Sequence, residues 1–263
     1  MLTKEALKKQ LGELGLRPDD TVTIHTSMKA IGEVEGGADT VIDAFCEYLN
    51  RGLFLVPTHT WAYVGKSQPV YDVRSTPACI GALPRTAALR KDGYRSLHPT
   101  HSLWGHGKGA EEYLRGEDNL CTPCAPASAY GRLAEVGAKI LLIGVGNDKN
   151  TFIHAVEEMA DLPNRLSPEP RSLTVIDHDG QKIPVSMHKH FCTETNDVSR
   201  YFVNFEPALV ACGAQTFGKL GNAEVRVVDA KKCRDVILGI LSRAERDLCT
   251  SYLEIPKEFY LKL

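Results

Sequence analysis

Thr21-Val22-Thr23-Ile24-His25 and Leu53-Phe54-Leu55-Val56-Pro57 are the two stretches of sequence that decide the fold. Both have the length of a strand and are rich in β-branched and apolar residues. Between them, residues 36–49 begin with two glycines and then carry apolar side chains at helical spacing. A strand, a helix and a second strand in this order are typical of a parallel or mixed sheet covered by helices. The sequence therefore predicts an α/β fold with a mixed sheet flanked by helices.

The same alternation continues along the chain. Thr3 is expected to cap a helix over the first dozen residues. Further helices are expected over residues 79–90, 128–135, 151–160 and 230–243, strands over 139–145 and 224–228, and a hairpin over 173–186. Residues 58–103 are rich in Pro, His and Gly and are expected to form long loops, where binding groups often collect. Because no repeat or linker interrupts the pattern, we expect one domain over residues 1–263.

Composition and charge narrow the class of protein. Of the 263 residues, 43% are hydrophobic and 24% are charged, which is sufficient for an ordinary core without disulfides. The net charge of −2 provides no basic field, so nucleic acid is not an expected partner. Residues 1–10 lack the apolar core of a signal peptide, and apolar runs such as 140–145 are too short to span a bilayer. These features predict a cytoplasmic protein with no membrane partner, in which the eight cysteines remain thiols.

The clearest local feature for chemistry is Asn150-Thr-Phe-Ile-His-Ala-Val-Glu157, which follows an apolar strand and a glycine-containing turn. His154 should therefore lie early in a helix near the carboxyl end of a strand, a frequent place for ligand sites in open α/β sheets. Glu157 is three residues further on and shares a helix face with His154. A carboxylate beside an imidazole can orient the ring and favour its action as a general base. Spacing alone favours the simpler alternative, a half-buried histidine satisfied by its neighbour.

A second feature is the cluster of histidines at positions 98, 101 and 106. His98 and His101 could join Cys121 and Cys124, a C-x-x-C pair, as four zinc ligands. A single C-x-x-C with Thr-Pro between its cysteines is a weak signal for zinc. We therefore predict no metal and keep a zinc-dependent hydrolase as an alternative function.

A third feature is the end of the first strand, His25-Thr-Ser-Met-Lys29, which leads into a turn. Hydroxyl groups, backbone N–H groups and a lysine at such a turn can hold phosphate oxygens, although an ordinary polar strand end explains the same residues. Gly144-Val-Gly146 is not a dinucleotide fingerprint, because Lys149 stands where the third glycine is needed. The chain also has no Walker A motif.

Taken in order, several blocks resemble the aminoglycoside 3-N-acetyltransferase family, also called the antibiotic acetyltransferase family. The blocks are His25-Thr-Ser-Met-Lys-Ala-Ile-Gly32, Val56-Pro-Thr58, Arg95-Ser-Leu-His-Pro-Thr-His-Ser102, residues 131–146 and Asn150-Thr-Phe-Ile-His-Ala-Val-Glu157. The resemblance runs through most of the chain. It implies the α/β fold of the antibiotic N-acetyltransferases, which is distinct from that of the GCN5-related acetyltransferases.

The resemblance also implies an activity. Acetyl-CoA would donate its acetyl group directly, in a ternary complex, to an amine such as the 3-amino group on the deoxystreptamine ring of an aminoglycoside. His154 is similar to the catalytic histidine of the family, Glu157 to the carboxylate beside it, and His25 to an active-site histidine beside the pantetheine. The coenzyme-binding positions that the resemblance implies are His25, Thr26, Ser27, Met28 and Lys29 for the strand-end turn, and Ser102 and Leu103 for the wall of the channel.

The acceptor is less closely defined. A polycationic sugar needs carboxylates around it, and acids in loops or at helix ends could supply them: Asp72, Glu158, Asp161, Glu194 and Asp197. As isolated residues, all are equally well explained as surface acids. His98 matches a family position and is expected to contact the substrate or to support its loop. Leu103 stands where the family often has an aromatic residue, so a different small-molecule amine remains an alternative acceptor. A coenzyme-binding homologue without activity is a further alternative, and the chain is expected to be a monomer or a homodimer.

Overall fold

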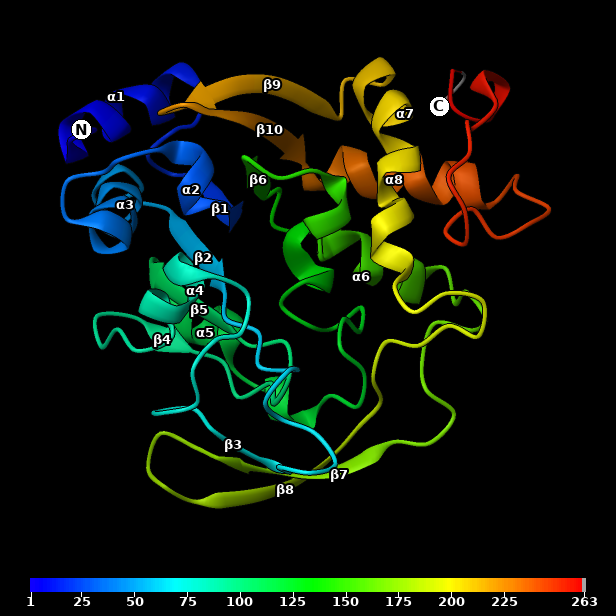
Figure 1. Cartoon of the computed structure of the whole chain (residues 1–263), viewed down its shortest axis with the longest axis horizontal. Helices are drawn as coiled ribbons and strands as arrows, with labels where there is room; N and C mark the ends of the chain where they lie inside the picture. The colour runs from blue at the N-terminus through cyan, green and yellow to red at the C-terminus, as the bar shows by residue number, and fades with distance from the viewer. Residues whose placement is uncertain (262–263) are drawn as a thin grey trace.

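The computed structural model describes residues 1–261, and its central feature is a mixed sheet (Figure 1). In these residues the sheet has seven strands in the order β4-β5-β2-β1-β6-β10-β9. Strands β1, β2 and β6 are parallel, whereas β4, β5, β9 and β10 join by antiparallel pairing. The bounds are β1 Thr21–Thr26, β2 Leu53–Pro57, β4 Tyr94–Arg95, β5 Leu103–Gly107, β6 Lys139–Ile143, β9 Gln215–Leu220 and β10 Ala223–Asp229. The predicted mixed sheet is confirmed.

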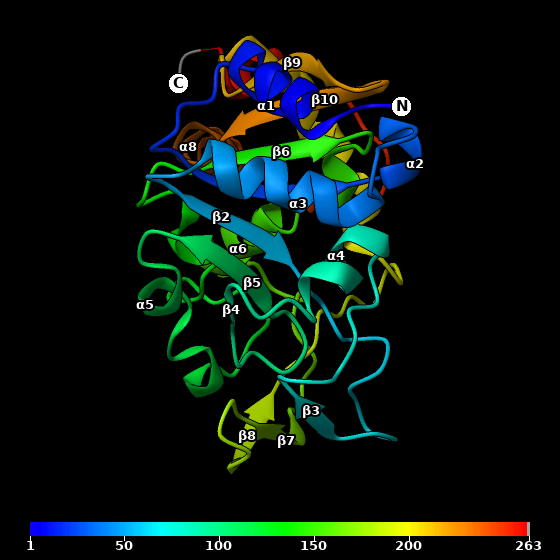
Figure 2. The same ribbon diagram turned by 90° about the vertical axis from the view of Figure 1, so that its left-hand side faces the viewer.

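Helices cover both faces of this sheet, and the alternation of side chains along β1 shows why. Val22 and Ile24 belong to one apolar cluster with α1, α3 and α4, while His25 pairs with Leu142 on the face covered by α5, α6, α7 and α8. Figure 2 shows α3 in front of the strands and α6 and α8 behind them. The bounds are α1 Lys4–Glu13, α2 Met28–Ile31, α3 Gly37–Tyr48, α4 Ala82–Ala87, α5 Ala110–Leu114, α6 Phe152–Met159, α7 Glu206–Ala211 and α8 Ala230–Leu241. The 3₁₀ helices are η1 Glu117–Asn119, η2 Gly131–Leu133, η3 Asn147–Lys149, η4 Val198–Phe205 and η5 Lys257–Phe259.

A smaller sheet lies beside the main one, at the bottom of Figures 1 and 2. It consists of β3 (Val70–Asp72), β7 (Arg171–Ile176) and β8 (Lys182–Met187), in the order β3-β7-β8. The antiparallel pairing of β7 with β8 confirms the predicted hairpin. This sheet has its own apolar cluster around Tyr71, whose hydroxyl donates to the carbonyl of Ser96. The single domain expected over residues 1–263 stays a prediction.

Most predicted elements are confirmed, and Thr3 caps α1 as expected. The helix expected over residues 128–135 is wrong: only the three residues of η2 are helical, because Gly131 packs against the carbonyls of Ala125 and Pro126. His106 does not share a loop with His98 and His101, since it lies on β5. No strand was expected at β5, where glycines interrupt the apolar pattern, or at β9. Within residues 1–261, no helix has the length and apolar character needed to cross a membrane.

We predict that Gly144→Ala lowers the free energy of unfolding by about 3 kcal/mol. Gly144 follows β6 with φ 66°, and a Cβ there would overlap the Cβ of Ala30 in α2. A left-handed backbone costs an L-residue about 1–2 kcal/mol, and overpacking adds about 1–3 kcal/mol. Urea unfolding of both proteins measures the difference.

Gly137→Ala is the matched control. Its φ is 63°, but an added Cβ would meet no atom within 4 Å. We therefore expect a loss of only about 1 kcal/mol, the backbone contribution alone. Equal losses in the two variants would mean that the contact between Gly144 and α2 has no energetic consequence.

Candidate active site

The candidate active site lies where several strands of the main sheet end. The carboxyl ends of the parallel strands β1, β2 and β6 meet at one edge, and the pairing of Pro57 with Leu103 brings the start of β5 to the same place. A cavity of about 830 Å³ opens there. Its histidine lining comes from separate segments of the chain: His25, His59, His101, His154 and His190. The cavity is therefore assembled from residues that are far apart in the sequence.

His154 occupies the first turn of α6 and is fixed by a chain of charged groups. Its Nδ1 lies 3.0 Å from Oε2 of Glu157, and the other oxygen of Glu157 is 2.5 Å from Nε of Arg165. Arg165 also donates from Nη2 to Asp247 at 2.6 Å. The side chains of Glu157 and Arg165 are only 2% and 4% exposed, so this ion pair is screened little by water.

The geometry defines which nitrogen of His154 can act as a base. A carboxylate can only accept hydrogen bonds, so Nδ1 carries the proton that Glu157 accepts. The other nitrogen, Nε2, then keeps its lone pair, and no hydrogen bond to it is present within residues 1–261. His154 lines the cavity. The arrangement can therefore take a proton from a bound molecule.

Aromatic contacts hold the ring of His154 in place. The ring of His190 stacks on it with centroids 3.9 Å apart, and Phe202 meets it edge-on at 4.8 Å.

The charges of the ion pairs behind His154 are also stabilised. Burial opposes the charge of Arg165, but its bonds to Asp247 and Glu157 raise its pKa. Burial is the largest influence on Asp247 and by itself would raise its pKa, but the hydrogen bonds from Arg165 and from the backbone of Cys249, together with the charge of Arg165, lower it overall.

The other histidines around the cavity are held in the neutral form. Burial lowers the pKa of His25 to about 4. It also lowers the pKa values of His59, His101 and His190, and neighbouring histidines lower them further. His59 has a firm partner, because its Nε2 lies 2.6 Å from the buried hydroxyl of Tyr130. At neutral pH these rings line the cavity as uncharged groups.

His98 supports its loop and does not line the cavity. Its Nδ1 accepts from the backbone N–H groups of Thr100 and His101, so its Nε2 donates to the carbonyl of Thr122. Both ring nitrogens are thus engaged. In the described part of the chain, no group of three His, Cys, Asp or Glu side chains is arranged to hold a metal ion. The zinc alternative gains no support from this geometry.

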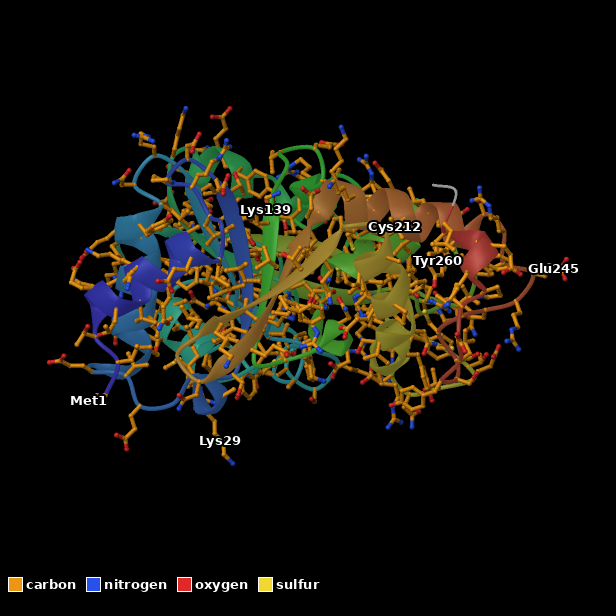
Figure 3. All side chains as sticks on the ribbon, turned by 90° about the horizontal axis from the view of Figure 1, so that it is seen from above. Met1, Lys29, Lys139, Cys212, Glu245 and Tyr260 are labelled. Atoms are coloured by element: carbon orange, nitrogen blue, oxygen red, sulfur yellow. The ribbon has the colours of Figure 1, made fainter. Side chains whose placement is uncertain are left out.

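The predicted coenzyme residues fall into two groups. His25 and Thr26 line the cavity, and His25 Nε2 and Thr26 Oγ1 are buried atoms without a hydrogen-bond partner in residues 1–261. Ser27 caps α2, and Met28 and Lys29 lie outside the lining. Figure 3 shows Lys29 extending away from the body of the protein, at the opposite edge of the sheet from Lys139.

Ser102 and Leu103 are completely buried and lie outside the lining. The hydroxyl of Ser102 donates to the carbonyl of Thr58, and the backbone N–H of Leu103 donates to Ser96 Oγ. These bonds fasten the start of β5 to neighbouring segments. The structure therefore places both residues behind the cavity wall, and their contact with the coenzyme stays a prediction.

None of the four predicted acceptor-binding residues, Asp72, His98, Glu158 and Asp161, lines the cavity. Asp72 pairs with Arg74 at 2.8 Å. Glu158 accepts hydrogen bonds from Thr122 Oγ1 and Cys124 N, and Asp161 is exposed in a left-handed turn after α6. The carboxylates of Asp72 and Glu158 thus already have partners within the protein. Their role in binding the acceptor has no support in this geometry.

Several residues of the site were not predicted from the sequence. His190 stacks on His154 from 36 positions away, and Asp247 reaches Arg165 from the C-terminal segment. Sequence spacing carries no signal for such contacts. For His59 the sequence does carry a signal, because it follows Pro57-Thr58 at the end of β2, in a region that faces substrate in relatives and where strand-end loops collect binding groups.

Comparison with known proteins places this chain and its fold among the acetyltransferases. The family model described as aminoglycoside 3-N-acetyltransferase matches residues 23–242. The chain belongs to the aminoglycoside 3-N-acetyltransferase family, a family of acyltransferases. This confirms the resemblance found in the sequence and the expected fold.

Individual proteins similar to this chain support the same family assignment. Aminoglycoside N(3)-acetyltransferase VII of Streptomyces paromomycinus is 31% identical over 182 residues, 62% of this chain, and the chain spans 63% of that enzyme. Aminoglycoside acetyltransferase AAC(3)-IVa, solved as a mutant in complex with a gentamicin, is 27% identical with a TM-score of 0.77, covering 92% of this chain and 89% of that one. AAC-IIIb, solved as a binary complex with CoASH, shows the same fold at 24% identity and a TM-score of 0.79, over 92% and 96% of the two chains.

We predict that Arg165→Leu lowers the free energy of unfolding by about 3 kcal/mol or more at pH 7. The substitution leaves the buried carboxylate of Glu157 without its cation, and breaking a buried ion pair costs about 3–5 kcal/mol. Arg115→Leu is the matched control, because Arg115 is 69% exposed and pairs with Glu111 on the surface, where such pairs contribute about 0–1 kcal/mol. Urea unfolding that gave equal losses for the two variants would contradict the importance of the buried pair.

We also predict that acid destabilises the protein through His25. Its pKa is about 4 in the folded state against about 6.5 in an unfolded chain, so the unfolded chain binds more protons between these values. The free energy of unfolding should therefore fall as the pH is lowered from about 6.5 to about 4. In His25→Leu the slope should decrease by up to about 1.4 kcal/mol per pH unit, which is one proton. Urea unfolding at several pH values tests this, and unchanged slopes would contradict it.

Proposed function

We propose that this protein transfers the acetyl group of acetyl-CoA directly to an amine of a small molecule, within a ternary complex and with His154 as the general base. One observation carries the proposal. His154 lines the cavity while its Nδ1 is held 3.0 Å from Glu157, which leaves Nε2 available for a proton. Membership of an acetyltransferase family supports the reaction type.

The proposed chemistry balances as one acyl transfer. An alkylammonium first loses one proton to solvent, because only the neutral amine can attack a thioester, and as the amine attacks, Nε2 of His154 takes a second proton from the same nitrogen. The new C–N bond forms at the acetyl carbon, the C–S bond breaks, and the coenzyme leaves as a thiolate. The proton then passes from His154 to the sulfur, giving a free thiol and an amide. Glu157 stabilises the imidazolium that exists between these steps.

Two buried polar atoms at the end of β1 support the binding of acetyl-CoA at this point of the cavity. Buried polar atoms without partners are unfavourable, and His25 Nε2 and Thr26 Oγ1 are two such atoms in the described chain. A bound ligand would supply the missing hydrogen bonds at this point of the cavity. We therefore propose that the pantetheine lies beside His25 and that the pyrophosphate lies at the turn formed by Thr26, Ser27, Met28 and Lys29, where Lys29 supplies a cation.

The family name provides one candidate acceptor, the 3-amino group on the deoxystreptamine ring of an aminoglycoside. A different small-molecule amine is the second candidate, and the charges of the residues that line the cavity are relevant to the choice between the two. We propose further that the protein is cytoplasmic and acts as a monomer or a homodimer, as expected from the sequence.

We predict that His154→Ala lowers kcat by about 10²–10⁴-fold while the Kd for acetyl-CoA stays within about two-fold of wild type. A positioned base contributes a factor of this size, and an alanine removes only the base. The measurement is the release of free thiol from acetyl-CoA in the presence of an amine, together with calorimetric binding of acetyl-CoA.

The control is His106→Ala, because His106 lies on β5 outside the cavity and bonds to the carbonyl of Asp92. Its kcat should match wild type. Chelation with EDTA should leave thiol release unchanged, whereas loss of activity on chelation would favour the zinc alternative. Full activity of His154→Ala would overturn the proposed role of this residue.

A further inference from the structure

Two cations line the cavity on the side of the small sheet. Arg171 begins β7, and Lys189 follows the end of β8. A Cβ on Gly65 would lie 3.2 Å from Nη1 of Arg171, so the guanidinium rests against bare backbone next to the cavity residue Val64. In residues 1–261 neither cation has a carboxylate within 4 Å. Both charges are thus available to a bound molecule.

Among the described residues, the cavity lining contains two carboxylates, and each has a hydrogen-bond or ion-pair partner within the protein. Asp148 pairs with Lys149 at 2.9 Å, and Asp197 accepts from the backbone N–H and the hydroxyl of Ser199 at the start of η4. The carboxylate nearest to the proposed base in sequence, Glu157, is neutralised by Arg165. The described lining of the cavity therefore holds two cations without a carboxylate partner, Arg171 and Lys189, and one carboxylate without a cation, Asp197.

The histidines do not change the balance of charge in the cavity. Burial keeps His25, His59 and His101 in the neutral form near pH 7. A polycation such as a deoxystreptamine antibiotic would place several ammonium groups in this cavity without enough carboxylates to compensate the water they lose. An anionic group beside a guanidinium and an ammonium gains charge-assisted hydrogen bonds instead.

We propose that the acceptor is a small amine that also carries an anionic group, a carboxylate or a phosphate, and that Arg171 and Lys189 bind this group while the amine faces His154. The proposal rests on the acetyl transfer proposed above and specifies its substrate class. It differs from the polycationic acceptor that the family name suggests. Arg171 and Lys189 are then specificity-determining residues, because they select the charge of the acceptor.

The phosphates of acetyl-CoA are the competing anions for these two cations. Figures 1 and 2 both show the small sheet at the opposite end of the molecule from α2, which follows the turn proposed to hold the pyrophosphate. This separation favours the acceptor, rather than the pyrophosphate, as the ligand on the small-sheet side. Measuring the Michaelis constants of both substrates shows whether these two cations bind the acceptor or the phosphates of acetyl-CoA.

The test compares amines of different charge in the thiol-release assay: glucosamine 6-phosphate and 4-aminobutyrate as anionic amines, glucosamine as a neutral sugar, and gentamicin as a polycation. We expect the wild-type kcat/KM to be at least ten-fold higher for one of the anionic amines than for gentamicin. In the double variant Arg171→Gln/Lys189→Gln, the KM for the anionic amine should rise about ten-fold, equivalent to about 1.4 kcal/mol. Its KM for acetyl-CoA should stay within two-fold, which also shows that the variant is folded.

Lys182→Gln is the matched control, since Lys182 is an exposed residue of β8 outside the cavity. Its KM values should equal those of wild type. Three outcomes overturn the proposal: a preference for gentamicin, a rise in the KM for acetyl-CoA alone in the double variant, or no thiol release with either anionic amine. Thiol release with gentamicin that depends on His154 would retain the proposed acetyl transfer and reject only the substrate class. No release with any of the four amines would count against the acetyl transfer itself.

Discussion

The carboxylate of Glu157 is the group on which the candidate site depends. It is buried beneath the cavity, where a single charge would be strongly unfavourable without compensation. Arg165 supplies the opposite charge, and Asp247 balances Arg165 in turn. The chain of ion pairs thereby connects α6 to the loop that follows it and to the C-terminal segment. His154 takes its orientation from the end of this chain, so the tautomer of the proposed base is set by residues that do not line the cavity.

At Glu157 burial requires a partner of opposite charge, whereas at the cavity histidines burial removes the charge itself. The strand ends collect histidines, and exclusion of water keeps their rings uncharged. Neutral imidazoles can donate and accept hydrogen bonds without adding to the charge of the cavity. In the part of the chain that the structure describes, the cavity cations without a carboxylate partner are Arg171 in the small sheet and Lys189 just after it, and this sheet is a separate layer with its own apolar cluster. The main sheet thus supplies the proposed chemistry, and the small sheet supplies the electrostatic character of the opposite wall.

The local pattern of the sequence predicted those parts of the fold that depend on short-range order. Strands β1, β2 and β6 are apolar runs with clear ends, and α6 follows a glycine-containing turn. β5 was not predicted because its pairing with β2, rather than its own composition, keeps Leu103–Gly107 extended. For His154, spacing alone favoured a half-buried histidine satisfied by a neighbour. The structure has that feature and the cavity together, since the same bond to Glu157 that satisfies Nδ1 leaves Nε2 free.

The sequence by itself determined the α/β class, the central strands, the pairing of His154 with Glu157 and the family resemblance. All of these depend on residues close together in the chain or on blocks in a fixed order. Only the tertiary structure decided that His190 stacks on His154, that Arg165 and Asp247 complete the buried charges, and that Asp197 lines the cavity whereas Asp72, Glu158 and Asp161 do not. Such contacts join residues tens of positions apart. They form because the strand ends meet at one edge of the sheet, and no spacing in the sequence encodes which loops meet there.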